Sequence, residues 1–137
     1  MKKLLLLVAA LALPLCGYAI AQQAPTPDSC IVNEALQPGV GFEPKFDEIH
    51  TAEITKLLDK VANCKPLQFS KDGTVFQNKE GLLPKQELGY YREYTLIIPQ
   101  DPPLTNRGAE RIIIGGGTEL FYTGDHYRHF TSFHIVR

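Results

Sequence analysis

Three groups of polar side chains have the types and spacing needed for proton transfer beside a phosphate. Glu93 stands inside an aromatic and β-branched run, residues 90–98, where a carboxylate either faces solvent or has partners. Arg107 and Arg111 lie four residues apart, and two neighbouring guanidinium groups can clamp a phosphate through bidentate hydrogen bonds. His126 follows a Gly-Asp turn, where an imidazole can be held in place and titrate near neutral pH.

A fourth group spans five consecutive residues between a short strand and a loop. An aromatic ring, backbone amides and a carboxylate so close together can bind a flat base, by stacking and by hydrogen bonds to its edge. Each group taken alone has a plainer interpretation, because polar turns, solvated arginines and exposed strand glutamates are common. The residues of this fourth group are Phe76, Gln77, Asn78, Lys79 and Glu80.

Several other chemistries lack their sequence motifs. The three glycines at 115–117 have neither the lysine nor the following helix of a phosphate-binding loop. No metal-ligand spacing and no dinucleotide fingerprint occur, and Ser70 and Ser132 lack the setting of a nucleophilic serine. We therefore predict no metal and no cofactor. His50, His129 and His134 are interpreted as surface or core groups, although His129 is close enough to compete with His126.

The elements that must position these residues are one helix and several strands. Apolar spacing between Phe46 and Val61 predicts a helix with Thr51 as its N-cap and its firm part at residues 51–63, after a Gly- and Pro-rich loop at residues 36–44. One early helix followed by about five short strands indicates an α+β domain, with the N-terminal helix packed on an antiparallel sheet. The predicted strands are residues 74–77, 90–98, 111–114, 119–123 and 130–136.

The N-terminal end has the three parts of a secretory signal. Lys2 and Lys3 precede an apolar run too short to span a bilayer, and an Ala-Ile-Ala cleavage site ends at residue 21. An uncleaved anchor and a lipoprotein attached at Cys16 match the pattern less well. We predict a signal peptide at residues 1–21, an N-terminal arm at 22–45, a domain at 46–137, and export without membrane attachment after cleavage.

Charge and cysteine content narrow the function classes. Of the 14 Lys and Arg, two leave with the signal, so that 12 basic and 15 acidic residues give a formal charge of −3. That balance excludes a strongly basic nucleic-acid coat, and 44% hydrophobic residues exclude wholesale disorder. Cleavage would leave Cys30 and Cys64, and an even pair in an exported chain predicts the disulfide Cys30–Cys64.

Taken together and in order, the four groups resemble the secreted guanyl-specific ribonucleases of microbes, the family of barnase. The resemblance covers roughly the last half of the chain, and the small branch with F-Q-N-x-E and Y-Y-x-E-Y motifs is most similar. It implies the microbial ribonuclease fold and cleavage of single-stranded RNA after guanosine. The matching segments are residues 69–80, 89–95, 107–113 and 122–127.

The resemblance implies a metal-free transphosphorylation that yields a 2′,3′-cyclic phosphate, which is then hydrolysed to the 3′-phosphate. Glu93 matches the general base for the ribose 2′-hydroxyl, and His126 the general acid for the leaving 5′-oxygen. Arg107 and Arg111 match the pair that stabilises the charged phosphorane. A carboxyl and an imidazole, with reference pKa values of about 4.3 and 6.5, can work as such a pair in a mildly acidic to neutral window.

The resemblance also assigns base recognition. Glu80 would accept the two adjacent donors of guanine, N1–H and N2–H₂, while the backbone amides of residues 77–79 would donate to O6. Adenine would leave the carboxylate facing a lone pair, which is costly. Tyr127 is the expected stacking partner of the base. The implied substrate-binding residues are Phe76, Gln77, Asn78, Lys79, Glu80 and Tyr127.

This chain departs from the family in two places, and other functions stay open. Lys79 stands where the family often has arginine, and the loop between Glu93 and Arg107 is longer here. The alternatives are a catalytically idle RNA- or protein-binding domain of the same fold, or the same enzyme deployed as an antibacterial toxin. Because an exported ribonuclease endangers its maker, a small acidic inhibitor of the barstar kind is an expected partner. The chain is expected to be a monomer.

Overall fold

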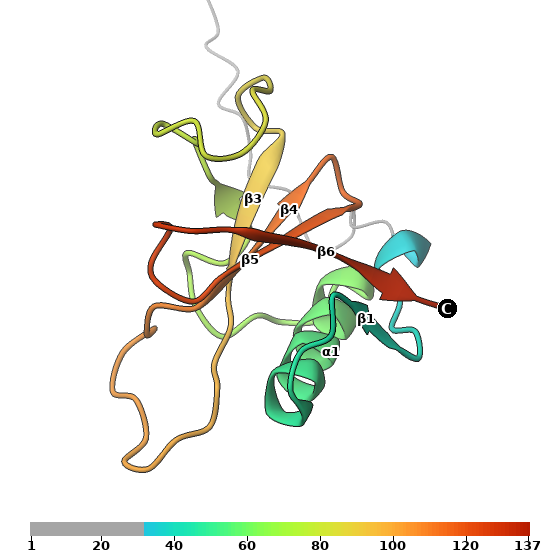
Figure 1. Cartoon of the computed structure of the whole chain (residues 1–137), viewed down its shortest axis with the longest axis vertical. Coiled ribbons are helices and arrows are strands. Elements are labelled where there is room, and N and C mark those ends of the chain that lie inside the picture. Colours follow the sequence, from blue (N-terminus) through green and yellow to red (C-terminus); the bar gives the residue numbers. More distant parts are fainter. Residues whose placement is uncertain (1–31) are drawn as a thin grey trace, which may run out of the picture.

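A computed structural model describes residues 32–137 (Figure 1). The predicted signal peptide at residues 1–21, most of the predicted arm, and Cys30 lie outside the described residues. Export and the Cys30–Cys64 pairing therefore stay predictions. Within residues 32–137, no helix is both long and apolar enough to cross a membrane.

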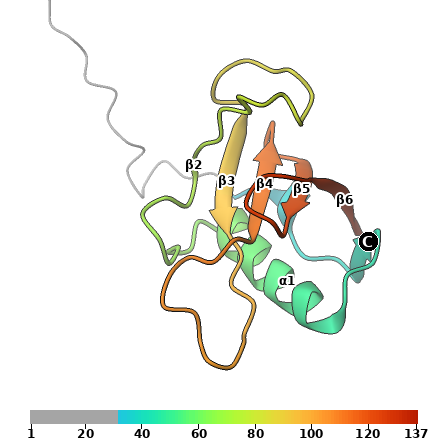
Figure 2. The same ribbon diagram turned by 60° about the vertical axis from the view of Figure 1, so that its left-hand side comes forward.

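One helix packs against a six-stranded antiparallel sheet, which confirms the predicted α+β class and adds a strand to the expected five (Figure 2). The strand order across the sheet is β1-β6-β5-β4-β3-β2. The elements are η2 (Glu34–Leu36), β1 (Gly41–Glu43), α1 (Glu48–Ala62), β2 (Thr74–Val75), β3 (Tyr91–Thr95), β4 (Arg111–Gly115), β5 (Glu119–Thr123) and β6 (Thr131–Val136).

Helix α1 begins earlier than predicted. Asp47 is its N-cap, because an Asp47 carboxylate oxygen accepts a hydrogen bond from the backbone N–H of His50 at 2.9 Å. The prediction of Thr51 as N-cap was wrong, since Thr51 lies one turn inside the helix and its hydroxyl donates to the Phe46 carbonyl. Two good capping residues stand close together here, and the one that reaches the free N–H groups of the first turn sets the boundary.

The predicted loop at residues 36–44 contains the additional strand, β1. Phe42 pairs with Ile135 of β6, and both Leu36 and Phe42 are buried in the core. Gly39 permits this close approach, because a Cβ atom there would lie 2.0 Å from the Val136 carbonyl oxygen. The strand was missed because its pairing partner lies more than 90 residues away in the chain, which local patterning does not reveal.

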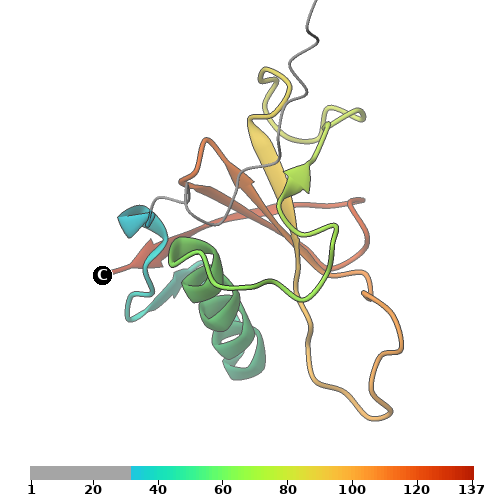
Figure 3. The same cartoon turned by 180° about the vertical axis from the view of Figure 1, so that it is seen from behind.

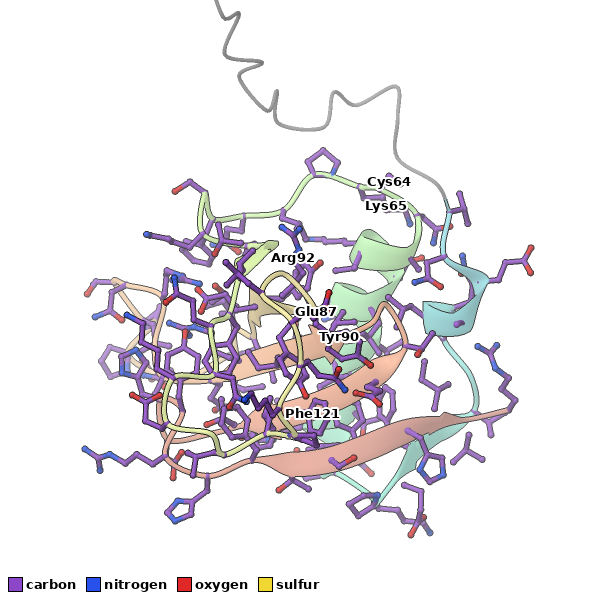
Figure 4. The ribbon with its side chains drawn as sticks, turned by 90° about the horizontal axis from the view of Figure 1, so that it is seen from above. Cys64, Lys65, Glu87, Tyr90, Arg92 and Phe121 are labelled. Carbon is purple, nitrogen blue, oxygen red and sulfur yellow. The ribbon has the colours of Figure 1, made fainter. Side chains whose placement is uncertain are left out.

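Apolar side chains cover both faces of the sheet. Ile112 and Ile114 of β4 belong to the core against α1, whereas Ile113 between them belongs to a second cluster on the opposite face. Phe121 lies in this second cluster and Tyr90 packs against it; both are labelled in Figure 4, which also shows Cys64 just beyond the end of α1. The second cluster consists of Leu83, Tyr91, Ile113 and Phe121, with Phe76, Tyr90, Tyr127 and Phe130 packed against it.

Strand β3 ends at Thr95 and not at Ile98 as predicted. Leu96 N–H still donates to the Glu110 carbonyl at 3.1 Å, and beyond it the chain leaves the sheet as a long loop that returns at Arg111 (Figures 1 and 2). Ile97 and Ile98 favour a strand by residue type, but β propensity yields no strand where no neighbouring strand is available to pair.

Candidate active site

Strands β3 and β4 bring the first site residues side by side. Thr95 of β3 pairs with Arg111 of β4, which pairs in turn with Thr123 of β5. Glu93 lies two residues before Thr95 and therefore on the same face of the strand. The antiparallel register thus places a carboxylate beside a buried arginine, which is 3% exposed.

Both carboxylate oxygens of Glu93 are engaged. Oε1 accepts a hydrogen bond from Arg107 Nη2 at 3.3 Å, and Oε2 accepts one from the Tyr127 hydroxyl at 2.7 Å. The Glu93 side chain is 14% exposed. It is therefore not the solvated strand glutamate of the plainer interpretation, but a partly buried carboxylate fixed between a cation and a phenol.

Arg111 is held by neutral acceptors. Its Nη1 donates to the carbonyl oxygens of Arg107, Gly108 and Glu110 at 2.7–3.2 Å, and its Nε donates to the Tyr127 hydroxyl at 3.2 Å. Within residues 32–137, no carboxylate forms an ion pair with Arg111. The end of the long loop therefore wraps around a guanidinium whose positive charge is left available to an anion.

A buried carboxylate behind Arg107 completes this network. Asp72, whose side chain is 2% exposed, accepts hydrogen bonds from the Thr95 N–H and hydroxyl through Oδ1 at 2.7 and 2.6 Å. The Thr95 hydroxyl accepts in turn from Arg107 Nε at 2.9 Å. Sequence reasoning missed Asp72 and Thr95, because Asp-Gly is an ordinary turn signal and only the folded chain brings it to the end of β3.

Tyr127 lies between the predicted base-binding residue Phe76 and the Glu93 carboxylate. Its ring stacks on Phe76, with centroids 5.3 Å apart and planes at 21°, while its hydroxyl bridges Glu93 and Arg111. Burial first, and then the hydrogen bond to Glu93, raise the pKa of Tyr127. The phenol therefore stays protonated through the neutral range and remains a donor to the carboxylate.

The turn that carries His126 has an uncommon backbone. His126 and Tyr127 have φ values of 58° and 71°, in the left-handed region that few residues other than glycine adopt. His126 is exposed, and its ring centroid lies 4.9 Å from that of Tyr127. The turn thus presents the imidazole to solvent at the edge of the site, next to the phenol that contacts Glu93.

Asp125 holds this turn in place. Its Oδ1 accepts hydrogen bonds from the Thr123 hydroxyl and from the backbone N–H groups of Arg128 and His129, at 3.0–3.1 Å. The Thr123 hydroxyl accepts in turn from the Tyr127 N–H at 3.1 Å. Hydrogen bonds from His129, its side chain contributing most, hold the pKa of Asp125 well below its usual range. His129 therefore contacts the turn through Asp125.

The predicted base-binding loop is closed by Asn78. The Asn78 side chain donates to the Leu83 carbonyl at 2.8 Å and accepts from the Leu83 N–H at 3.0 Å, and its φ is 49°. Gln77, Lys79 and Glu80 are exposed. The backbone N–H groups of residues 77–80 have no acceptor among residues 32–137. These backbone donors are the ones that the sequence-based prediction assigns to the base, and that assignment stays a prediction.

Apart from the half-buried Asn78, the predicted residues fall into two groups. A chain of direct hydrogen bonds joins Glu93, Arg107, Arg111 and Tyr127, and Phe76 stacks on the Tyr127 ring. His126, Gln77, Lys79 and Glu80 are exposed around them. In the described part of the chain, no cluster of three or more His, Cys, Asp or Glu could hold a metal ion.

A carboxylate, a phenol, an imidazole and two guanidinium groups together can move protons and stabilise an anion.

A model of the ribonuclease family matches residues 44–134. The chain belongs to this family. The match takes in α1, β2 to β5 and most of β6, and hence every residue of the candidate site.

Curated relatives agree with this assignment. Guanyl-specific ribonuclease Sa from Kitasatospora aureofaciens is 49% identical over 80 residues, which are 58% of this chain and 80% of that protein. Guanyl-specific ribonuclease St from Saccharopolyspora erythraea is 39% identical over 89 residues, 62% of this chain and 85% of that protein.

Solved structures show the same fold. A structure of ribonuclease Sa2 in complex with mononucleotides matches 63% of this chain and 84% of its own, with 34% identity and a TM-score of 0.55. Ribonuclease Sa2 with guanosine-2′-cyclophosphate matches 59% of this chain, again with 34% identity and a TM-score of 0.52. The antiparallel sheet and its helix are therefore the ribonuclease fold.

Proposed function

We propose that this ribonuclease is a guanyl-specific endoribonuclease that cleaves single-stranded RNA by metal-free transphosphorylation. The observation that carries the proposal is the Glu93 carboxylate, fixed between Arg107 and Tyr127 beside the buried Arg111. Guanine specificity is supported by relatives that are named guanyl-specific ribonucleases.

In the first step, Glu93 takes the proton of the ribose 2′-hydroxyl, whose oxygen then attacks the neighbouring phosphorus. Tyr127 and Arg107 orient the two carboxylate oxygens, and a base held in this way needs little rearrangement before it reacts. The attacking group belongs to the substrate itself, so that this step requires no activated water.

The arginines act on the charge that develops on the phosphate. Arg111 is buried, fixed by three carbonyl oxygens and without a carboxylate partner in the described chain, so that its charge is free to meet the phosphorane. Arg107 contacts the Glu93 carboxylate itself, so that a second positive charge lies beside the proposed general base. Fixed cations in a partly buried site stabilise a transition-state anion strongly because they need not reorganise.

His126 is the general acid that protonates the leaving 5′-oxygen. Its exposed place in a rigid turn suits this role, because the leaving nucleoside must depart toward solvent. The P–O5′ bond breaks and the 2′,3′-cyclic phosphate forms. In the slower second step the roles reverse. His126 takes a proton from water, whose oxygen attacks the phosphorus, while the P–O2′ bond breaks and the protonated Glu93 returns its proton to O2′, which leaves the 3′-phosphate.

Guanine is read by the loop at residues 76–80. The free N–H groups of this loop donate to O6, and the exposed Glu80 accepts from N1–H and N2–H₂. Tyr127 contacts the catalytic carboxylate and Phe76 at once, so that its position couples base binding to the reacting centre. Adenine has an acceptor at N1 and no 2-amino group, and it would leave Glu80 without donors.

Digestion of GpN and ApN dinucleotides in EDTA tests the proposal. We expect cleavage after guanosine only, with a 2′,3′-cyclic phosphate product, and loss of about 10²–10⁴ in kcat for Glu93→Gln. Glu87→Gln, which changes an exposed glutamate outside the site, is the matched control and should retain activity. Cleavage after every base would overturn the guanine assignment and leave the catalytic one intact.

Further parts of the proposal concern where the enzyme acts and what binds it. The proposal also includes export, a monomeric state and a barstar-like acidic inhibitor. An inhibitor of this kind would bind the arginine cluster, so that Arg107→Ala should weaken the complex.

The alternative of an idle RNA-binding domain requires that a folded, pure sample bind RNA and leave it intact. Antibacterial use requires delivery into competitor cells.

A further inference from the structure

A cluster of polar side chains outside the candidate site connects α1 to the start of β4. Glu110, the residue directly before β4, accepts a hydrogen bond through Oε2 from the hydroxyl of Tyr122 in β5 at 2.8 Å. The same oxygen lies 3.1 Å from Nε2 of His50 in α1, and Nδ1 of His50 lies 2.6 Å from the Asp47 carboxylate. One carboxylate therefore connects the end of the long loop both to the helix and to the sheet.

Aromatic packing holds this cluster in one arrangement. The side chains of His50 and Glu110 are only 23% and 26% exposed. The Phe46 ring stacks on His50 and meets the Tyr122 ring edge to face, with centroids 6.5 and 5.3 Å apart. Burial first, and then the hydrogen bond to Glu110, raise the pKa of Tyr122. The Tyr122 hydroxyl therefore remains a donor to the carboxylate through the neutral range.

The backbone of Glu110 contacts Arg111 of the candidate site. Its carbonyl oxygen accepts from Arg111 Nη1 at 2.7 Å, which is the shortest of the three carbonyl contacts of this guanidinium. The same carbonyl accepts from the Leu96 N–H at 3.1 Å. The long loop that follows β3 extends away from the sheet and returns here, to the start of β4 (Figure 3). The residue that ends this loop is thus held through its side chain and holds Arg111 through its backbone.

We propose that Glu110 is a positioning residue that fixes the Arg111 guanidinium for the reaction. The contacts of its side chain with Tyr122 and His50 keep its carbonyl oxygen in place. The assignment rests on the proposed function, in which Arg111 meets the charge of the phosphorane. A guanidinium that is oriented in advance need not reorganise as charge develops, and a misplacement of about 1 Å can lower a rate about 10²-fold. Helix α1 thereby contributes to the site through His50.

Removal of the Glu110 side chain should slow cleavage and leave substrate binding largely intact. We expect kcat for GpN to fall about 10- to 100-fold in Glu110→Ala, with KM within about twofold, because Arg111 acts mainly on the charge of the transition state. Glu110→Gln keeps an oxygen that can accept from the Tyr122 hydroxyl, and it should retain kcat within about threefold. Tyr122→Phe removes one of the two side-chain contacts of Glu110 and should have an intermediate kcat.

Two controls separate positioning from a general loss of stability. Val61→Ala removes packing between α1 and the core at the end of the helix opposite His50, and it should lower the urea midpoint of unfolding without changing kcat. In an Arg111→Ala background, Glu110→Ala should lower kcat no further, because the group that it positions is gone. Rates are compared without denaturant, after urea unfolding has shown that each variant is folded.

Two kinetic results would overturn the positioning role. The first is a kcat for folded Glu110→Ala that is as high as that of Val61→Ala. The second is an equal further fall of kcat when Glu110→Ala is added to Arg111→Ala, since Glu110 would then act on another group.

A measurement without turnover tests the same contact. NMR gives the rate at which the side-chain N–H protons of Arg111 exchange with water, and this rate should be higher in Glu110→Ala than in the unmodified protein. An unchanged rate would overturn the positioning role. If the unmodified protein leaves GpN intact, the proposed function fails, and the exchange rate still decides whether Glu110 fixes Arg111.

Discussion

The catalytic network and the base-binding loop are built in contrasting ways. Glu93, Arg107 and Arg111 stand on or beside paired strands, and each is held by two or more side-chain hydrogen bonds. The loop at residues 76–80 is closed by Asn78 alone, and its Glu80 side chain is exposed. On the proposed function, the groups that meet a developing charge are fixed in advance, whereas the side chain that would recognise the base is exposed.

The largest expected effect is a loss of stability when Asp72, the buried carboxylate behind Arg107, is removed. Asp72→Ala leaves the Thr95 and Phe69 donors without their acceptor in a buried place, and should lower the free energy of unfolding by about 3–5 kcal/mol. Urea unfolding measures this change. Glu80→Ala in the loop should stay within about 0.5 kcal/mol of the unmodified protein. Equal losses in the two variants would show that the two regions are built alike.

The loop at residues 76–80 should affect the choice of base without affecting the catalytic step. Glu80→Gln should lower the preference for GpN over ApN by about 10- to 100-fold, because the amide can accept only one of the two guanine donors. The pH dependence of kcat should stay as it is, since Glu80 does not contact the catalytic residues. Steady-state kinetics on both dinucleotides give this preference; if it does not change, another residue selects guanine.

A third, smaller effect concerns acid stability of the His126 turn. The pKa of Asp125 is lowered in the folded protein, so that its carboxylate stabilises the fold above the ordinary value of 3.8 and loses that contribution as the pH falls below it. The difference in unfolding free energy between the unmodified protein and Asp125→Asn should therefore narrow below about pH 4. Urea melts from pH 2.5 to 6 test this expectation. A difference that grows toward low pH would contradict the assigned hydrogen bonds.

The smallest effect is expected from Lys79→Arg. Lys79 is exposed in the loop and contacts no catalytic group, so that a planar guanidinium should change KM for GpN by no more than a few-fold and leave kcat unchanged. A change in kcat would connect the loop to the network and weaken the contrast between them.

Local sequence patterns predicted the correct fold class and located most of the helices and strands. The apolar spacing after Phe46 located the helix, and the aromatic and β-branched runs located β3 to β6, because side-chain periodicity reports burial directly. Strand β1 escaped detection because three residues between glycines and a proline form a strand only when β6 lies beside them. The end of β3 was misplaced for the same reason, since Ile97 and Ile98 lack a strand to pair with.

The chemical groups of the site could be identified from the amino-acid sequence alone: a carboxylate, two arginines, a histidine turn and a polar loop predicted to bind a base, in an order that resembles one ribonuclease family. It did so because these residue types and short spacings are local properties of the chain. The folded chain was needed to show that Tyr127 donates to Glu93, that Asp72 and Thr95 support Arg107, and that Asp125 holds the His126 turn. Such contacts depend on strand register and loop closure, which join residues up to 34 positions apart.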